Sequence, residues 1–294
     1  MSVKSAPATV DGVSREELHE IERLAVELAG IAGSEITAGL GDILSVRYKT
    51  AVKTPDETDE RWRDPVSEID YKVETLIRAR LAENFPEHDI IGEEMDERPG
   101  RDHDFVWAVD PIDGTANFVN GFPMFAASIG VLHKGRPVVG ALWCSVSHAL
   151  RSGVYHASAG GKLRFDGSDV TPKINPAVRR RLVGVPVATE SDAVWETRKT
   201  GSAALECALV AAGLMQVARF AAPNIWDVAG GLALVSAAGG AARVRDGGRW
   251  RAMERFTAGR DTHGHSEPDL RFWRGEIIVG ETESADRMCE FHAP

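Results

Sequence analysis

The segment WAVDPIDGT, residues 107–115, combines a buried strand with a rigid acidic turn. Its apolar start predicts the strand, and the turn carries Asp110 and Asp113, two carboxylates three positions apart. Pro111 fixes φ between them, and Gly114 permits a sharp turn after them. Carboxylate oxygens held in this way suit Mg²⁺, Mn²⁺ or Ca²⁺ better than Zn²⁺. The segment predicts a metal site, with a plain surface turn as the alternative.

The composition describes a globular protein whose main partner is not a polyanion. The formal net charge is −10, and 43% of the residues are apolar. This charge argues against nucleic acid but permits a small phosphorylated substrate, because a bound cation can reverse the local sign. No secretory signal and no apolar run long enough for a membrane span are found. Cysteines without zinc-site spacing favour a reduced, cytoplasmic setting; they are Cys144, Cys207 and Cys289.

Hydrophobic periodicity predicts two halves, residues 14–165 and 180–294, separated by a polar segment at 166–180. In the first half we expect capped helices at 14–33 and 67–85. Strands are expected at 126–132, 137–146 and 154–157. Residues 49–64 alternate in charge without periodicity and predict an exposed loop, for which a lid is one alternative.

The second half alternates strands with helices, which indicates α/β layering. Its expected strands are 182–187, 214–220, 241–244, 250–253 and 276–279. Its expected helices are 202–212 and the apolar segment that ends at Gly239 and Gly240. Asp227 stands at the expected N-cap of that second helix, so simple capping competes with any functional role for it.

Acidic residues recur at strand ends and helix starts, where loops concentrate function. They are Asp70, Glu93, Asp110, Asp113 and Asp227. If four converge, each pair at about 4 Å costs about 4 kcal/mol at an effective dielectric constant near 20. Several such pairs would rival the whole stability of a domain, about 5–15 kcal/mol. The cluster must therefore bind protons or cations, and Mg²⁺ with a substrate phosphate fits it better than a Ca²⁺ cage.

Motifs between about residues 65 and 240 agree, in sequence order, with those of one known family. They are PVSEID (65–70), GEE (92–94), WAVDPIDGTANFVNGFP (107–123), Arg198 with GSAAL (201–205), and IWDVAGGLALVSAAGG (225–240). They resemble the motifs of the inositol monophosphatase family of magnesium-dependent, lithium-sensitive phosphatases. Agreement of several separated motifs makes this resemblance specific.

The resemblance implies a role for each candidate site residue. The first Mg²⁺ would be held by Glu93, Asp110, the carbonyl of Ile112 and Thr115; the second by Asp110, Asp113 and Asp227. Asp70 would help bind a third, weaker ion, and Mn²⁺ is an alternative to Mg²⁺. Glu93, Thr115 and Asp70 would serve catalysis by orienting or deprotonating the attacking water. Substrate contacts would come from Gly114, Thr115, Gly201, Ser202, Ala203, Phe220 and Asp227.

The resemblance also implies a layered αβαβα sandwich of the α/β (α+β) class, a homodimer, and inhibition by lithium. Attack by water would be in line. A phosphoenzyme is not expected, because neither Cys144, Cys207 nor the serines have an evident base partner for covalent catalysis.

Some positions depart from the family pattern. Phe220 stands where typical animal members have a carboxylate that binds inositol hydroxyls, and an apolar ring cannot accept those hydrogen bonds. Lys49 and Lys53 are both candidates for a lysine that is often found in the preceding loop. Arg219 is either a contact for a second phosphate or a plain exposed arginine.

These observations favour a magnesium-dependent phosphatase for an inositol-1-phosphate-like polyol or sugar phosphate. Fructose-1,6-bisphosphatase, histidinol-phosphatase and phosphoadenosine-phosphate phosphatase activities are alternatives that share the metal site. A non-catalytic metal- or phosphate-binding regulator is the alternative from another class, and it predicts the loss of at least one ligand. A nucleotide-binding oxidoreductase is set aside because no GxGxxG follows a predicted strand.

Overall fold

The computed structural model describes residues 9–10, 12–41, 46–48, 65–100, 103–173, 175–179, 181–187, 194–260 and 267–292. The expected loop at 49–64, with Lys49 and Lys53, lies outside these residues.

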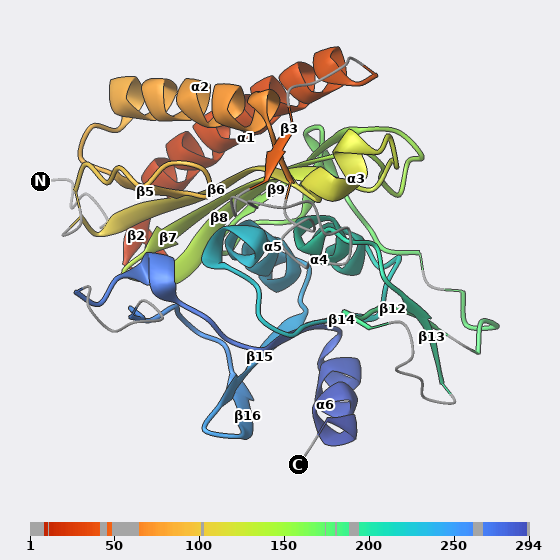
Figure 1. Ribbon diagram of the computed structural model, residues 1–294. Helices are drawn as coiled ribbons and strands as arrows, with labels where there is room; N and C mark the ends of the chain where they lie inside the picture. Colours follow the sequence, from red (N-terminus) through yellow and green to blue (C-terminus); the bar gives the residue numbers. More distant parts are fainter. Residues whose placement is uncertain are drawn as a thin grey trace, which may run out of the picture.

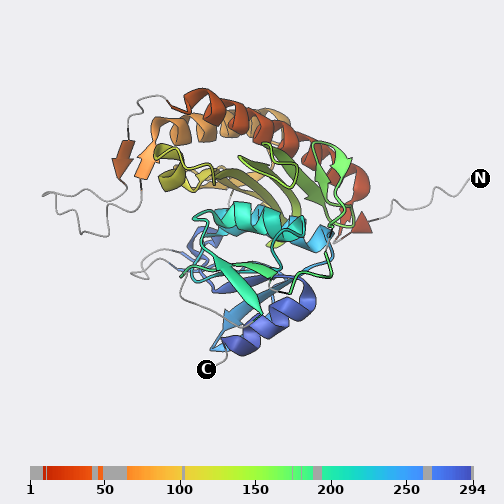
Figure 2. The same cartoon turned by 90° about the vertical axis from the view of Figure 1, so that its right-hand side faces the viewer.

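The described chain is built in layers of helices and sheets (Figure 1). α1 (Arg15–Gly39) and α2 (Glu68–Asn84) cover the outer face of the larger sheet. α4 (Ala203–Ala211) and α5 (Ile225–Ala237) lie between the two sheets, and α6 (Thr282–Phe291) packs under the smaller sheet, as Figure 2 also shows. The predicted αβαβα sandwich is confirmed. Within the described residues, no helix combines the length and apolarity needed to cross a membrane.

The larger sheet has seven strands in the order β11-β10-β9-β8-β7-β6-β5, and only β5 and β6 pair in parallel. Its strands are β5 (Asp89–Gly92), β6 (Phe105–Asp113), β7 (Ala126–His133), β8 (Arg136–Cys144), β9 (Gly153–Ser158), β10 (Arg164–Phe165) and β11 (Ser168–Asp169). The predicted hairpin between β7 and β8 is present, with His133 opposite Arg136.

The smaller sheet has six strands in the order β13-β12-β14-β17-β15-β16, and β12 pairs in parallel with both of its neighbours. Its strands are β12 (Arg181–Gly184), β13 (Trp195–Arg198), β14 (Val217–Phe220), β15 (Ala241–Asp246), β16 (Arg249–Ala252) and β17 (Ile277–Gly280). Short strand pairs stand apart from both sheets: β1 (Thr9–Val10) with β2 (Val13–Ser14), and β3 (Val46–Tyr48) with β4 (Pro65–Ser67).

The two helices that the first half predicts begin where expected. Ser14 caps α1 by accepting a hydrogen bond from the backbone N–H of Glu17, and Ser67 is the N-cap of α2. α1 continues six residues beyond the predicted end at residue 33, to Gly39. Gly30 and Gly33 interrupt the apolar pattern in the sequence, and the buried side chain of Ile36 continues the apolar face beyond them.

The N-cap assignment for Asp227 is wrong. The N-cap of α5 is Asn224, and Asp227 is the third residue of the helix. The backbone N–H of Asn224 donates to Asp227 Oδ2 at 2.7 Å, in the reciprocal arrangement of a capping box. One of the two carboxylate oxygens is therefore held by the helix start, which fixes the side chain beside the larger sheet.

Glycines bring the backbone of α5 against β7 and β8. A Cβ at Gly140 would lie 2.2 Å from the carbonyl oxygen of Gly230, and a Cβ at Gly130 would lie 2.4 Å from the nitrogen of Gly230. No side chain fits at these positions without moving the helix. Because Asp227 is less than one turn before Gly230, this contact sets how closely Asp227 approaches the larger sheet.

We therefore expect Gly140→Ala to lower the free energy of unfolding by about 1–3 kcal/mol, the usual cost of overpacking. Urea denaturation measures this change. Gly30→Ala is the matched control, because a Cβ at Gly30 in α1 would meet no atom within 4 Å. There the same substitution should stabilise the protein by about 0.5–1 kcal/mol. An unchanged or higher urea midpoint for Gly140→Ala would contradict the close contact.

Candidate metal centre

An irregularity at the end of β6 places Asp110 and Asp113 on one side of the sheet. In a regular strand, residues three apart point to opposite faces. The pairing of β6 with β7 shifts register between Asp110 and Asp113, which allows both carboxylates to face the same space. Gly114 then adopts φ of 90°, a conformation that favours glycine, and starts the short helix α3 (Thr115–Val119).

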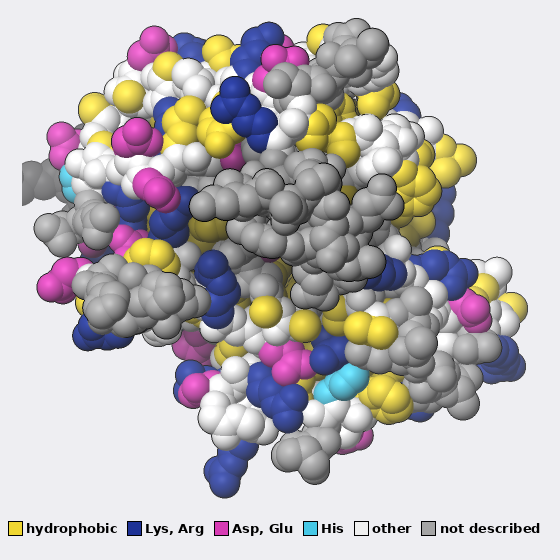
Figure 3. All heavy atoms as spheres, viewed as in Figure 1, with side chains coloured by type: hydrophobic (Ala, Val, Ile, Leu, Met, Phe, Trp, Pro, Cys, Tyr) yellow, Lys and Arg dark blue, Asp and Glu magenta, His cyan; other side chains and the backbone are white. Residues whose placement is uncertain are grey.

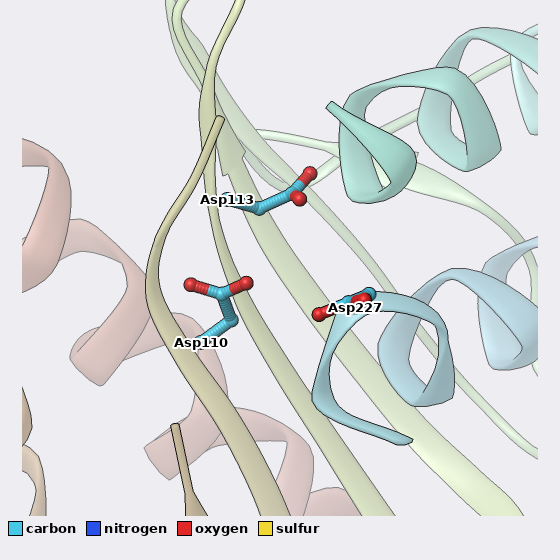
Figure 4. Close-up of side chains that lie close together, drawn as sticks. All are labelled: Asp110, Asp113 and Asp227. Atoms are coloured by element: carbon cyan, nitrogen blue, oxygen red, sulfur yellow. The ribbon is translucent and has the colours of Figure 1, made fainter. Parts of the chain in front are cut away.

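Asp227 completes a cluster with these two aspartates, as Figure 4 shows. Each residue offers a carboxylate oxygen, and these oxygens lie within 4.8 Å of one another. Asp110 is 2% exposed and Asp113 is 8% exposed, whereas Asp227 is half-buried. Figure 3 shows acidic side chains scattered over one face of the molecule, whereas the three aspartates in Figure 4 face one another.

The protein holds two of the three carboxylates with hydrogen-bond donors. Asp113 Oδ2 accepts from the hydroxyl of Ser202, the N-cap of α4, and from the backbone N–H of Ala204 at 2.7 Å. Asn224 holds Asp227 in the same way. In contrast, Asp110 Oδ1 is buried and has no hydrogen-bond partner among the described residues. A buried, unpartnered carboxylate oxygen beside two further carboxylates fits a cation ligand.

Burial and mutual repulsion shift the pKa values of all three groups upward. The pKa of Asp110 rises well above its ordinary value because of burial and then because of the charges of Glu93, Asp113 and Asp227. Burial raises the pKa of Asp113 to about 6, although the bonds from Ser202 and Ala204 oppose the shift. The pKa of Asp227 also rises well above its ordinary value, through burial and then repulsion by Asp113. Without a cation the cluster retains protons.

Glu93 lies beside Asp110 because β5 and β6 run in parallel and end at the same edge. Gly92 is the residue opposite Val109, and the backbone N–H of Glu93 donates to the carbonyl of Val109 at 3.1 Å. The charge of the Glu93 side chain contributes to raising the pKa of Asp110. The structure therefore brings Glu93 to the cluster of aspartates.

Asp70 and Thr115 form a linked pair next to the cluster. Thr115 Oγ1 lies 2.8 Å from the carbonyl oxygen of Ile112, to which it can donate, and 3.3 Å from Asp70 Oδ1. Asp70 is fully buried, and its Oδ2 accepts from the backbone N–H and the hydroxyl of Ser67 at 2.8 and 2.6 Å. The start of α2 is thereby connected to the turn after β6.

The loop before α4 reaches the same turn. Gly201 has φ of 83°, and its carbonyl oxygen would lie 3.2 Å from a Cβ at Gly114. Asn117 donates to the carbonyl of Thr200 at 2.8 Å and to that of Met124 at 2.6 Å. Asn117 is not among the predicted site residues, although it lies within the motif that follows Asp113. Ser202 and Ala203 continue from this loop into α4.

Two further candidate residues, Phe220 and Arg219, have other partners in the structure. Phe220 is 7% exposed and belongs to the hydrophobic core that contains Ile225 and Trp226, so its contact with substrate stays a prediction. Arg219 is not a plain exposed arginine: its guanidinium donates to Glu276 Oε1 at 2.8 Å and its side chain is 14% exposed.

Comparisons with known proteins agree with this fold. The chloroplastic phosphatase IMPL1 of Arabidopsis thaliana is 30% identical over 247 residues, which is 78% of this chain but only 64% of that relative. The fructose-1,6-bisphosphatase/inositol-1-monophosphatase of Aquifex aeolicus is 29% identical over 73% of this chain and 82% of its own length. The crystal structure of the extragenic suppressor protein suhB from Bartonella henselae superposes with a TM-score of 0.71 at 23% identity, covering 93% of this chain and 98% of that one.

The sequence model of one protein family, the inositol monophosphatase family, matches residues 17–270, a range that includes all the candidate site residues. The chain belongs to the inositol monophosphatase family.

Proposed function

We propose that the protein hydrolyses a small phosphate monoester, of the polyol or sugar phosphate kind, with Mg²⁺ as cofactor. Family membership supports a phosphoric monoester hydrolase that depends on a divalent metal. The observation that carries the proposal for this chain is the convergence of Asp110, Asp113 and Asp227, buried or half-buried, with Asp110 Oδ1 lacking a hydrogen-bond partner among the described residues.

We infer the following division of ligands. Glu93, Asp110, the Ile112 carbonyl and Thr115 would hold one Mg²⁺, and Asp110, Asp113 and Asp227 a second, while Asp70 would support a third. When bound, such cations lower the pKa of water and neutralise charge on the phosphoryl group. Mn²⁺ is expected to substitute, and lithium, which resembles Mg²⁺ in size, is expected to compete at the second site.

Chain residues would supply orientation and proton acceptance. The Thr115 hydroxyl lies between Ile112 and Asp70, and the Glu93 carboxylate lies beside Asp110. These positions support the proposal that both groups orient or deprotonate a water molecule there. We propose that the backbone N–H groups of Gly114 and Thr115 donate hydrogen bonds to the substrate phosphate. Gly201, Ser202 and Ala203 are proposed as further substrate contacts.

Direct attack by water agrees with the state of the cysteines. Cys144 and Cys207 are fully buried, and burial raises the pKa of both thiols, so neither is a thiolate nucleophile. Cys144, Cys207 and Cys289 are all free, which supports the proposed cytoplasmic setting.

Phe220 and Arg219 bear on which ester is preferred. An apolar Phe220 argues against inositol as the preferred alcohol, because it cannot accept hydrogen bonds from hydroxyl groups. Arg219 is paired with Glu276, and the charge of that carboxylate offsets the charge that Arg219 would offer to a second substrate phosphate. We therefore propose a monophosphate with few hydroxyls near Phe220, ahead of the bisphosphate alternative that the name of the Aquifex relative includes.

We also propose that residues 14–165 and 180–294 act as two halves that share this site, and that the protein is a homodimer. Three apolar side chains near a cavity of about 620 Å³ are exposed: Val178 (44%), Leu182 (37%) and Leu214 (44%). Charges of both signs line the same cavity, which suits contact with an identical copy; they are Lys173, Arg181, Glu281 and Glu283.

The function is tested by assaying phosphate release with and without Mg²⁺. The esters are inositol 1-phosphate, fructose 1,6-bisphosphate, histidinol phosphate and 3′-phosphoadenosine 5′-phosphate. We expect Mg²⁺-dependent turnover of at least one, and Asp110→Asn should reduce it by more than about 100-fold, the upper end of the loss seen for groups one step from a metal. Asp286→Asn, which changes a remote aspartate on α6, should leave it unchanged.

Full turnover by Asp110→Asn would refute the proposal. Mg²⁺ binding without hydrolysis of any of these esters would also refute it and would favour a non-catalytic metal- or phosphate-binding regulator. Lithium in the sub-millimolar to millimolar range should inhibit the wild type, and full activity in lithium would count against the second site.

The metal-free protein should lose stability as pH rises. The pKa of Asp113 is about 6 in the folded state against an ordinary 3.8, so the folded state binds the proton more tightly. This contribution is complete below about pH 4 and is lost as pH rises through about 6; for Asp113 alone it amounts to about 3 kcal/mol. Melting temperatures in chelator at pH 5 and pH 8 measure it.

Added Mn²⁺ should raise the melting temperature more at pH 8 than at pH 5, because the ligands bind metal only when deprotonated. Asp113→Asn is the control and should show a smaller fall with pH. If the melting temperatures of the wild type and of Asp113→Asn change equally with pH, the raised pKa of Asp113 is contradicted.

For the dimer, Leu214→Glu should convert the protein to a monomer in light scattering, because a buried carboxylate without a partner is costly at an interface. Leu150→Glu is the control and should leave the dimer intact, because Leu150 is 94% exposed and lies outside this surface. A monomeric wild type, or a variant that stays dimeric, would show that this surface is not the interface.

A further inference from the structure

Arg271 contacts the backbone of the loop that carries Glu93. It lies in the 3₁₀ turn η2 (Leu270–Phe272), far along the chain from that loop. Its Nη1 donates to the carbonyl of Gly92 at 2.5 Å and to that of Met95 at 3.2 Å, and its Nη2 donates to the carbonyl of Glu93 at 3.3 Å. Its Nη2 also pairs with Asp96 at 2.8 Å. One guanidinium therefore fixes the backbone on both sides of Glu93.

The same guanidinium lies over the ring of Trp226, with its central carbon 5.1 Å from the ring centroid. Trp226 is 6% exposed and immediately precedes Asp227 in α5. Stacking of this kind suits the planar guanidinium of arginine. Arg271 thus touches the two segments that bring Glu93 and Asp227 to the centre from different halves of the chain.

A buried ionic network anchors the turn itself. Asp269, the N-cap of η2, accepts from the backbone N–H of Arg271 at 2.8 Å and pairs with Arg98. Arg98 also pairs with Asp89, the first residue of β5. All three side chains are at most 5% exposed. Arg271 and Arg98 therefore tie η2 to both ends of β5, the strand that leads into Glu93.

We propose that Arg271 is a positioning residue for the metal centre. It sets the separation of Glu93 from Asp227 and thereby the affinity for a divalent cation. The proposal rests on the proposed metal centre but not on any particular substrate. A purely structural brace would change the stability of the fold, whereas a positioning residue changes metal affinity in protein that is still folded.

The experiment measures the dissociation constant of Mn²⁺ by isothermal titration calorimetry, with the metal-free melting temperature recorded for each variant. We expect Arg271→Ala to weaken Mn²⁺ binding about 10–100-fold, the usual loss when a partner behind a metal ligand is removed. Arg271→Lys should weaken it in the same range, because an ammonium group lacks the planar fork that spans three carbonyls.

Arg243→Ala is the matched control. Arg243 is also a partly buried arginine, paired with Asp286 at 2.8 Å, but it lies in β15 on the side of α6. It should bind Mn²⁺ as the wild type does. If Arg271→Ala does not fold, Arg271→Lys decides, because it retains the charge and the apolar stem.

Binding of Mn²⁺ by folded Arg271→Lys within twofold of the wild type would overturn the proposal while leaving the metal centre in place. A wild-type protein that binds no Mn²⁺ would overturn both the metal centre and the role of Arg271.

Discussion

Repulsion among carboxylates that are held out of water governs the centre of this protein. Asp110, Asp113 and Asp227 face one another, and burial raises the pKa of each before their mutual charges raise it further. At about 4 Å such pairs cost several kcal/mol each at an effective dielectric constant near 20. Donors from Ser202 and Asn224 hold two of the groups in place but do not neutralise them. The arrangement is therefore complementary to divalent cations, and the surrounding fold has to keep it from relaxing.

The fold keeps these carboxylates from moving apart, because each strand or helix that bears one is packed into a rigid layer. The register shift at the end of β6 orients Asp110 and Asp113, and parallel pairing with β5 brings Glu93 to the same edge. Glycine contacts hold α5, with Asp227, against the larger sheet. The site thus depends on the packing of layers from both halves of the chain. Placement on strands and helices limits how far the ligands can separate when metal is lost.

Much of this could be predicted from the sequence because it is local. The strand and turn around Asp110, the capped start of α2 and the hairpin of β7 and β8 are specified by residues that are close in the chain. Asn224 and Asp227 can both cap a helix, so the sequence leaves the N-cap ambiguous, and the hydrogen bond from the backbone N–H of Asn224 to Asp227 identifies Asn224 as the cap. The sequence does not predict α6 or β13: α6 has charged residues through most of its length, and β13 (WETR) has a single apolar residue. The contacts of Arg271 join residues about 180 positions apart, and no local sequence pattern predicts contacts at that separation.

The central claim is that these carboxylates gather to hold divalent cations. Anomalous diffraction from a crystal grown with Mn²⁺ tests it most directly, because manganese scatters anomalously and no atom of the protein gives a comparable peak. The account predicts strong peaks between Asp110, Asp113 and Asp227, with Glu93 on the Asp110 side. An anomalous map with no peak among these oxygens, at a Mn²⁺ concentration that saturates any binding in solution, would contradict it.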